Sequence, residues 1–297
     1  MPSRAGWRWR VAESATGLLI MLRKRVITAL FLAVILVWLL FFQGLLAWQG
    51  FLLLAGALAG DEWAALAAYD RPQRIAYAAL TLSLGTALLL VPPLHAACEI
   101  PLLGAAVLFW CLVVPVLLWR GWRVPGGLGF LLLGWLVILP TLLALSRLRE
   151  SGVALLLACM ALIWVSDIAA YFTGRAFGRH RLAPSISPGK TWEGVAGALL
   201  AVAFFGLALV ALAPYLPGLS SALVQAGWIW WPLLAGLAVL GIEGDLFESW
   251  LKRCAGVKDS GWILPGHGGV LDRIDALTAA LPAAALLILH SGNGGAP

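Results

Sequence analysis

Acidic side chains recur near the ends of the apolar segments in the second half of this chain. They are Asp167, Glu193, Glu243, Asp245, Asp272 and Asp275. Ionised groups are costly beside a bilayer and persist there when they have a task. Carboxylate oxygens suit Mg²⁺, which proteins usually hold through one or two carboxylates together with substrate phosphates. For each acid taken singly, a salt bridge to a nearby Arg or Lys remains an alternative explanation.

Helical spacing groups some of these acids. Asp245 and Ser249 are four residues apart, and Glu248 shares their face of a helix. Asp272 and Asp275 are three residues apart and also share a face. With this spacing, a bound metal ion could bridge two helices through Asp245 and Asp272.

Basic side chains accompany the acids. Lys252, Arg253, Lys258 and Arg273 lie close in sequence to Asp259 and to the last two acids. A second polar segment carries Arg175, Arg179, Arg181 and Lys190. Cations beside carboxylates are typical of sites that hold a metal and anionic oxygens together, as nucleotidyl transfer requires. For Arg179 and Arg181, membrane topology alone is an equal explanation.

Glycines and small polar residues add candidate phosphate contacts. In the stretch Pro265-Gly266-His267-Gly268-Gly269, glycines allow backbone N–H groups to approach a phosphate, and His267 could donate a hydrogen bond or transfer a proton. A turn before a helix would explain the same residues. Ser187 with Lys190 could bind phosphate, although Ser187-Pro188 fits a plain turn equally well.

A P-loop is excluded for the segment ending in Gly189-Lys190-Thr191. Pro184 stands where that motif needs its first glycine, and an apolar span rather than a strand precedes the segment.

The composition places these residues in a polytopic membrane protein. The chain has 297 residues, of which 62% are hydrophobic, and its mean hydropathy is +0.95. Since about 20 apolar residues span the hydrocarbon core, an all-α fold with nine transmembrane helices is expected. The predicted spans are 27–42, 44–60, 75–93, 101–119, 128–146, 153–172, 193–214, 228–247 and 274–290. Gln43-Gly44 separates the first two, and Pro92-Pro93 predicts a loop before the fourth.

The distribution of charge predicts the orientation. With nine spans and a cytoplasmic N-terminus, 18 of the 20 Lys and Arg residues face the cytoplasm, and Arg147 and Arg149 do not. The net charge of +6 then reflects topology and attraction to anionic membrane lipids. A nucleic-acid partner is disfavoured because the basic residues are scattered over separate loops.

One integral membrane domain with two unlike halves is expected. Residues 1–150 would form a helical scaffold and, if the protein is a homodimer, a candidate interface. Residues 151–297 would form the catalytic region, with cytoplasmic polar loops at 173–192 and 248–273.

The polar segments resemble a known family. Residues 249–275 read Ser-x-Leu-Lys-Arg-x4-Lys-Asp-x-Gly-x2-Leu-Pro-x-His-Gly-Gly-Val-x-Asp-Arg-Ile-Asp. This is similar to the signature of the phosphatidate cytidylyltransferase family, also called CDP-diacylglycerol synthases, as are residues 244–249 and 166–194. Ile168 and Gly189 depart from the family, where Thr and Lys are frequent. The similarity is concentrated in residues 160–275.

The resemblance implies an enzyme of the bacterial cytoplasmic membrane, with its active site facing the cytoplasm, that converts CTP and phosphatidic acid to CDP-diacylglycerol and pyrophosphate. It implies Mg²⁺ at Asp245 and Asp272, with a second cation such as K⁺ left open. The expected catalytic residues are Asp245, Asp272, Lys252, Arg253, Lys258, His267 and Arg273. The expected substrate-binding residues are Lys190, Ser187, Arg175, Ser249, Asp259, Gly268, Gly269, Asp167 and Glu193.

Two other functions stay open. Acids within a membrane also mark the pathways of ion or lipid-phosphate transporters. Transporters often consist of two related halves, whereas the polar residues here crowd into one half. A relative of the same family that acts on a different lipid phosphate is the other alternative, because the shape of an apolar cavity would select the acyl chains.

Overall fold

The computed structural model describes residues 26–121, 127–215, 227–263 and 268–293. These residues form long helices and one short hairpin. The helices are Val26–Phe42, α2 (Leu45–Leu66), α3 (Arg71–Leu90), α4 (Pro92–Leu108), α5 (Val114–Arg120), α6 (Leu128–Ser151), α7 (Val153–Phe177), α8 (Trp192–Leu212), α10 (Trp230–Cys254) and α11 (Leu271–Asn293). A π-helical turn, Phe109–Val113, joins α4 to α5, and single 3₁₀ turns occupy Ala213–Tyr215 and Gly227–Ile229.

The fold is that of an all-α membrane protein. Seven helices among the described residues are long and apolar enough to cross a membrane. Each of the nine predicted spans overlaps a helix, or, for 101–119, the continuous segment α4, π-helical turn and α5, but α2 and Val26–Phe42 are not among those seven. Nine membrane crossings therefore stay a prediction.

Two details of the predicted boundaries can be judged. The break at Gln43-Gly44 is confirmed, because one helix ends at Phe42 and α2 begins at Leu45. The loop predicted at Pro92-Pro93 is wrong. Both prolines lie in the first turn of α4, where a missing N–H costs no helical hydrogen bond, and Val91 alone separates α3 from α4.

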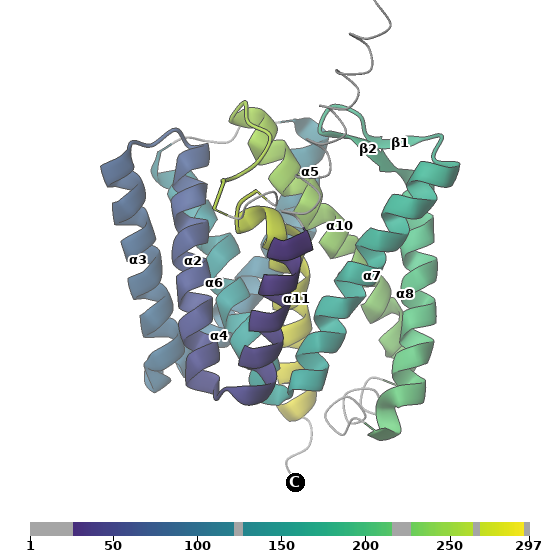
Figure 1. The fold of residues 1–297 in the computed structure, drawn as a ribbon, viewed down its shortest axis with the longest axis horizontal. Helices are drawn as coiled ribbons and strands as arrows, with labels where there is room; N and C mark the ends of the chain where they lie inside the picture. Colours follow the sequence, from purple (N-terminus) through teal and green to yellow (C-terminus); the bar gives the residue numbers. More distant parts are fainter. Residues whose placement is uncertain (1–25, 122–126, 216–226, 264–267, 294–297) are drawn as a thin grey trace, which may run out of the picture.

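The bundle is organised around α6 and α11 (Figure 1), the two candidate spans with the largest buried share. α11 packs against α10, α6 and α4, and it also contacts α7 and α2. Its central stretch, residues 276–285, is buried throughout and is rich in Ala and Leu. Small side chains let neighbouring helices approach closely. Close packing matters inside a membrane because the apolar lipid leaves no hydrophobic driving force for helices to associate.

The helices α7 and α8 form a pair at one side of the bundle and carry the hairpin at one end (Figure 1). Strands β1 (Arg181–Ala183) and β2 (Ser187–Thr191) pair in antiparallel register. The Thr191 side chain then caps α8 by accepting a hydrogen bond from Gly194 N at 3.1 Å. The hairpin, the end of α10 and the start of α11 lie toward the same end of the molecule, so this end collects both polar segments.

Candidate active site

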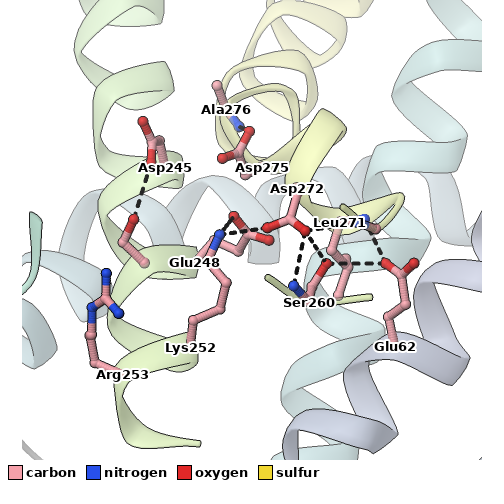
Figure 2. Close-up of polar contacts among 12 residues, drawn as sticks. Glu62, Asp245, Glu248, Lys252, Arg253, Ser260, Leu271, Asp272, Asp275 and Ala276 are labelled. Carbon is pink, nitrogen blue, oxygen red and sulfur yellow. Dashed lines mark hydrogen bonds and ion pairs between the residues drawn. The ribbon is translucent and has the colours of Figure 1, made fainter. Parts of the chain in front are cut away.

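A buried ion triad joins the last turn of α10 to the first turn of α11 (Figure 2). The ammonium of Lys252 lies 2.8 Å from Oε2 of Glu248 and 2.6 Å from Oδ1 of Asp272. The three side chains are 13%, 7% and 5% exposed, respectively. One lysine therefore faces two carboxylates that have little contact with solvent.

The second oxygen of Asp272 binds the loop that precedes α11. Oδ2 accepts hydrogen bonds from Ser260 N at 2.9 Å, Ser260 Oγ at 2.9 Å and Gly269 N at 2.8 Å. With Lys252 on Oδ1, four donors surround this carboxylate. Such bonds hold Asp272 in one orientation.

Asp245 lies in a second group that draws on four elements. Its Oδ2 is 2.7 Å from Nζ of Lys190 on β2, and Ser249 Oγ donates to its Oδ1 at 3.3 Å. Asp167 on α7 and Asp275 on α11 both interact electrostatically with Asp245. Three helices thus direct acids toward one region, with a lysine from the hairpin among them.

A close helix crossing brings the two groups side by side. A Cβ atom at Gly244 would lie 2.5 Å from the carbonyl oxygen of Asp275 and 3.1 Å from Cα of Ala276. Only a glycine therefore allows α10 and α11 to approach this closely. As a result, Asp245 faces Asp275, and Asp272 lies about one turn away (Figure 2).

The carboxylates fit a magnesium ion in donor chemistry. Among residues 26–121, 127–215, 227–263 and 268–293, no group of three or more His, Cys, Asp or Glu side chains is placed to hold a metal by itself. Mg²⁺ commonly needs only one or two protein carboxylates and takes its other ligands from water and substrate phosphates. Asp245 and Asp272 can supply that share, provided that Lys190 and Lys252 shift from their oxygens.

Other predicted residues take part in contacts around the hairpin. Arg253 donates from Nε to the carbonyl oxygen of Ile186 at 3.5 Å, so it ties the hairpin turn to α10. Arg175 is exposed and donates to the hydroxyl of Tyr171 at 2.9 Å. Glu193 accepts from the ring of His180 at 2.7 Å, and the structure does not bring it to Asp245 or Asp272.

The remaining predicted residues form no hydrogen bond or ion pair with Asp245 or Asp272 through their side chains among the described residues. Lys258, Asp259 and Arg273 have exposed side chains, and Ser187 begins β2. His267 lies outside the described residues. Gly269 directs its N–H to Asp272 rather than outward, so a phosphate contact through Gly268 and Gly269 stays a prediction.

Sequence reasoning missed Glu62, near the end of α2, and the linking residue Ser260. Glu62 is 2% exposed and accepts hydrogen bonds from Val270 N and Leu271 N, both at 2.8 Å. The Asp61-Glu62 pair stands out as charge at the end of an apolar run. Nothing in the sequence connects that pair to a loop some 200 residues later.

The chain is similar to known proteins along almost its whole length. The sequence model described as "Cytidylyltransferase family" matches residues 23–290. A phosphatidate cytidylyltransferase of Pseudomonas aeruginosa is 42% identical over 92% of this chain and 99% of the relative. One from Brucella suis is 37% identical over 90% and 92% of the two chains. One from Haemophilus influenzae is 43% identical over 51% and 54%.

Proposed function

The chain belongs to the cytidylyltransferase family, and from this premise we propose that it is an enzyme that makes CDP-diacylglycerol and pyrophosphate from CTP and phosphatidic acid. Support comes from relatives of that name along almost the whole chain. The observation that carries the proposal is that Asp245 and Asp272 lie on two helices that cross closely and that each acid pairs with a lysine, Lys190 and Lys252 respectively.

The reaction needs little proton transfer from the protein. A phosphate oxygen of phosphatidic acid attacks the α-phosphorus of CTP, and a new P–O–P bond forms. The bond from the α-phosphorus to the oxygen bridging toward the β-phosphorus breaks, and pyrophosphate leaves. Because the attacking phosphate is already mostly ionised at neutral pH, the site must mainly hold several negative groups together and in line.

Lysine side chains supply much of the positive charge in the site. In the structure, the ammonium groups of Lys190 and Lys252 form ion pairs with the carboxylates of Asp245 and Asp272, respectively. In the proposed complex they turn toward phosphate oxygens, together with Arg253, Lys258 and Arg273. Mg²⁺ held by Asp245 and Asp272 would neutralise charge on the triphosphate and on the leaving pyrophosphate. Asp167 and Asp275 then orient these cations.

The membrane arrangement is part of the proposal. Nine crossings with a cytoplasmic N-terminus, in the cytoplasmic membrane of a bacterium, put the hairpin and the α10–α11 end on the cytoplasmic side, where CTP is available. Support comes from the bias of Lys and Arg and from the common position of both polar segments in the fold. A homodimer stays a prediction.

The decisive experiment measures CTP-dependent release of pyrophosphate from the purified protein in lipid vesicles containing phosphatidic acid. We expect release with Mg²⁺ present and CDP-diacylglycerol as the lipid product. Asp245→Asn and Asp272→Asn should abolish both while the protein still inserts into membranes. Glu150→Gln, at the end of α6, is a matched control that should keep full turnover.

Three results would argue for other functions or sites. No CTP-dependent release by the wild-type protein would reject the activity. Release with another lipid phosphate but not with phosphatidic acid would favour the related enzyme of different specificity. Near-normal turnover in either Asn variant would reject that residue as a metal ligand.

A further inference from the structure

We propose that Glu62, from the first half of the chain, is a positioning residue for the reaction: its buried carboxylate fixes the start of α11 and so presents Asp272 toward α10. The inference rests on the proposed function, because it assigns Glu62 a role in that reaction. It changes the expected division of the molecule, in which residues 1–150 serve as scaffold.

Glu62 supplies acceptors to backbone groups that a helix leaves unpaired. The first N–H groups of any helix lack partners within it, and a negative charge is favoured there. Oε1 of Glu62 accepts from Val270 N at 2.8 Å, and Oε2 accepts from Leu271 N at 2.8 Å. With its side chain 2% exposed, Glu62 caps α11 away from competing water.

Ser260 and the backbone link this cap to Asp272 (Figure 2). Ser260 Oγ lies 2.9 Å from Oδ2 of Asp272 and 3.3 Å from Oε2 of Glu62. A hydroxyl has one hydrogen to donate, and the shorter distance favours Asp272. Since Gly269 N also donates to Asp272, three successive N–H groups are divided between the two carboxylates, and their positions depend on each other.

Glycines in the loop leave space for a carboxylate from the other half of the chain. A Cβ atom at Gly261 would lie 2.5 Å from Oε1 of Glu62, and one at Gly269 would lie 2.5 Å from Oε2. Contacts that close are essentially never made by a real Cβ atom. Gly261 and Gly269 therefore make room for Glu62, and a side chain at either position would collide with this acid from α2.

A positioning role for Glu62 and a purely structural role predict different effects on stability and on the binding of Mg²⁺ and CTP. If Glu62 only stabilised the fold, its removal would lower the melting temperature without changing how Mg²⁺ and CTP bind. Residues that orient metal ligands typically change metal affinity or activity by about 10–100-fold when they are lost. We expect a loss of this size in magnesium dependence, beyond any change in stability.

The test compares Glu62→Gln with its neighbour Asp61→Asn. Glutamine has one acceptor oxygen, and its NH₂ group would face a backbone N–H. We expect fast hydrogen exchange at Val270 and Leu271, a 10–100-fold rise in the Mg²⁺ concentration for half-maximal turnover, and loss of the thermal stabilisation by Mg²⁺ with CTP. Asp61 pairs with Arg74 on α3. Among the described residues it has no hydrogen bond or ion pair with the segment before α11, so Asp61→Asn should match the wild type.

A second variant covers the case in which Glu62→Gln does not fold. Ser260→Ala keeps the hydrogen bonds from Val270 N and Leu271 N to Glu62 and the one from its own N–H to Asp272. It removes only the hydrogen bond from the hydroxyl to Asp272, so it should weaken stabilisation by Mg²⁺ with CTP while Val270 and Leu271 stay protected from exchange. Unchanged exchange in a folded Glu62→Gln protein, or fast exchange with wild-type magnesium dependence, would overturn the positioning role.

The two proposals can fail separately. A wild-type protein without CTP-dependent release of pyrophosphate would reject the proposed function, and with it any role of Glu62 in that reaction. A wild-type protein that is active, with Glu62→Gln folded and indistinguishable from it, would reject the inference alone.

Discussion

At the scale of single residues, the triad of Lys252, Glu248 and Asp272 holds two acids and one base in a nearly solvent-free position. Burying an ion pair gains little stability over an apolar core, but removing one partner leaves an uncompensated charge. Because two buried acids share one lysine, the triad is sensitive to the loss of that lysine.

Replacing the triad's lysine should therefore harm both stability and activity. We expect Lys252→Met to destabilise the protein by about 3–5 kcal/mol and to abolish turnover, as measured by thermal unfolding in detergent and by release of pyrophosphate. Adding Glu248→Gln should restore much of the melting temperature, because one fewer buried acid is left without its lysine partner, without restoring turnover. Arg71→Met, at the exposed start of α3, controls for loss of a surface cation.

A melting temperature for Lys252→Met equal to that of the wild type would contradict the assigned ion triad. Recovery of turnover in the double variant would show instead that Lys252 balances charge and does not bind substrate.

Some contacts within the site could be predicted from the sequence and others could not. Helical spacing predicted that Ser249 shares a face with Asp245, and their hydrogen bond at 3.3 Å follows from it. No local rule predicts Glu62, because its hydrogen bonds to α11 span 208 and 209 residues. The roles of Lys190 and Lys252 as partners of particular acids likewise depend on how separate elements pack.

At the scale of elements, the crossing of α10 and α11 sets the geometry of the acids. Gly244 contacts the backbone of α11, so the separation of the helices there is limited by backbone atoms rather than by flexible side chains. Backbone atoms cannot move aside without displacing the helix. A single methyl group at this position should thus shift one acid-bearing helix against the other.

We expect Gly244→Ala to lower turnover by about 100-fold, the cost of misplacing reacting groups by about 1 Å. Gly236→Ala on the same helix is the matched control, since a Cβ atom there meets nothing within 4 Å. Alanine favours a helix over glycine by about 1 kcal/mol, so the control should be as active and at least as stable as the wild type. Equal turnover in the two variants, measured with saturating CTP, would contradict the assigned role of the crossing.

The elements themselves were largely predictable because hydropathy determines where membrane helices form. The helices extend beyond the apolar runs, however: α7 continues to Phe177 and α10 to Cys254. The predicted loops 173–192 and 248–273 are shorter for this reason. The hairpin at residues 181–191 was not predicted, since its strands have three and five residues and contain Pro188, which leaves no period-2 pattern to recognise.

At the scale of the whole molecule, the two basic residues predicted to lie outside the cytoplasm have structural partners. Arg149 donates to the carbonyl oxygens of Leu40 at 2.9 Å and Gln43 at 3.3 Å, where the helix Val26–Phe42 ends. Arg147 lies 3.6 Å from carboxylate oxygens of both Glu99 and Glu150. These two exceptions to the charge bias are thus explained by local contacts, and the bias itself keeps its value for the orientation.

The proposed orientation leads to a prediction about accessibility on the two sides of the membrane. Ser185 lies in the exposed hairpin turn before α8, and the exposed Tyr215 lies at the other end of the candidate span Trp192–Tyr215. We expect a cysteine at Ser185 to react with a membrane-impermeant thiol reagent only after spheroplasts are permeabilised. A cysteine at Tyr215 should react in intact spheroplasts.

The measurement requires a protein whose native thiols do not react. Cys111 and Cys254 are exposed, so all four native cysteines are first replaced, and retained turnover confirms that the fold survives. Because a single span separates the two test positions, labelling of both from one side would contradict the assignment of α8 as a crossing. Labelling of Ser185→Cys alone in intact spheroplasts would show that the topology is the reverse of the proposed one. The acids would then lie on the side of the membrane that lacks CTP.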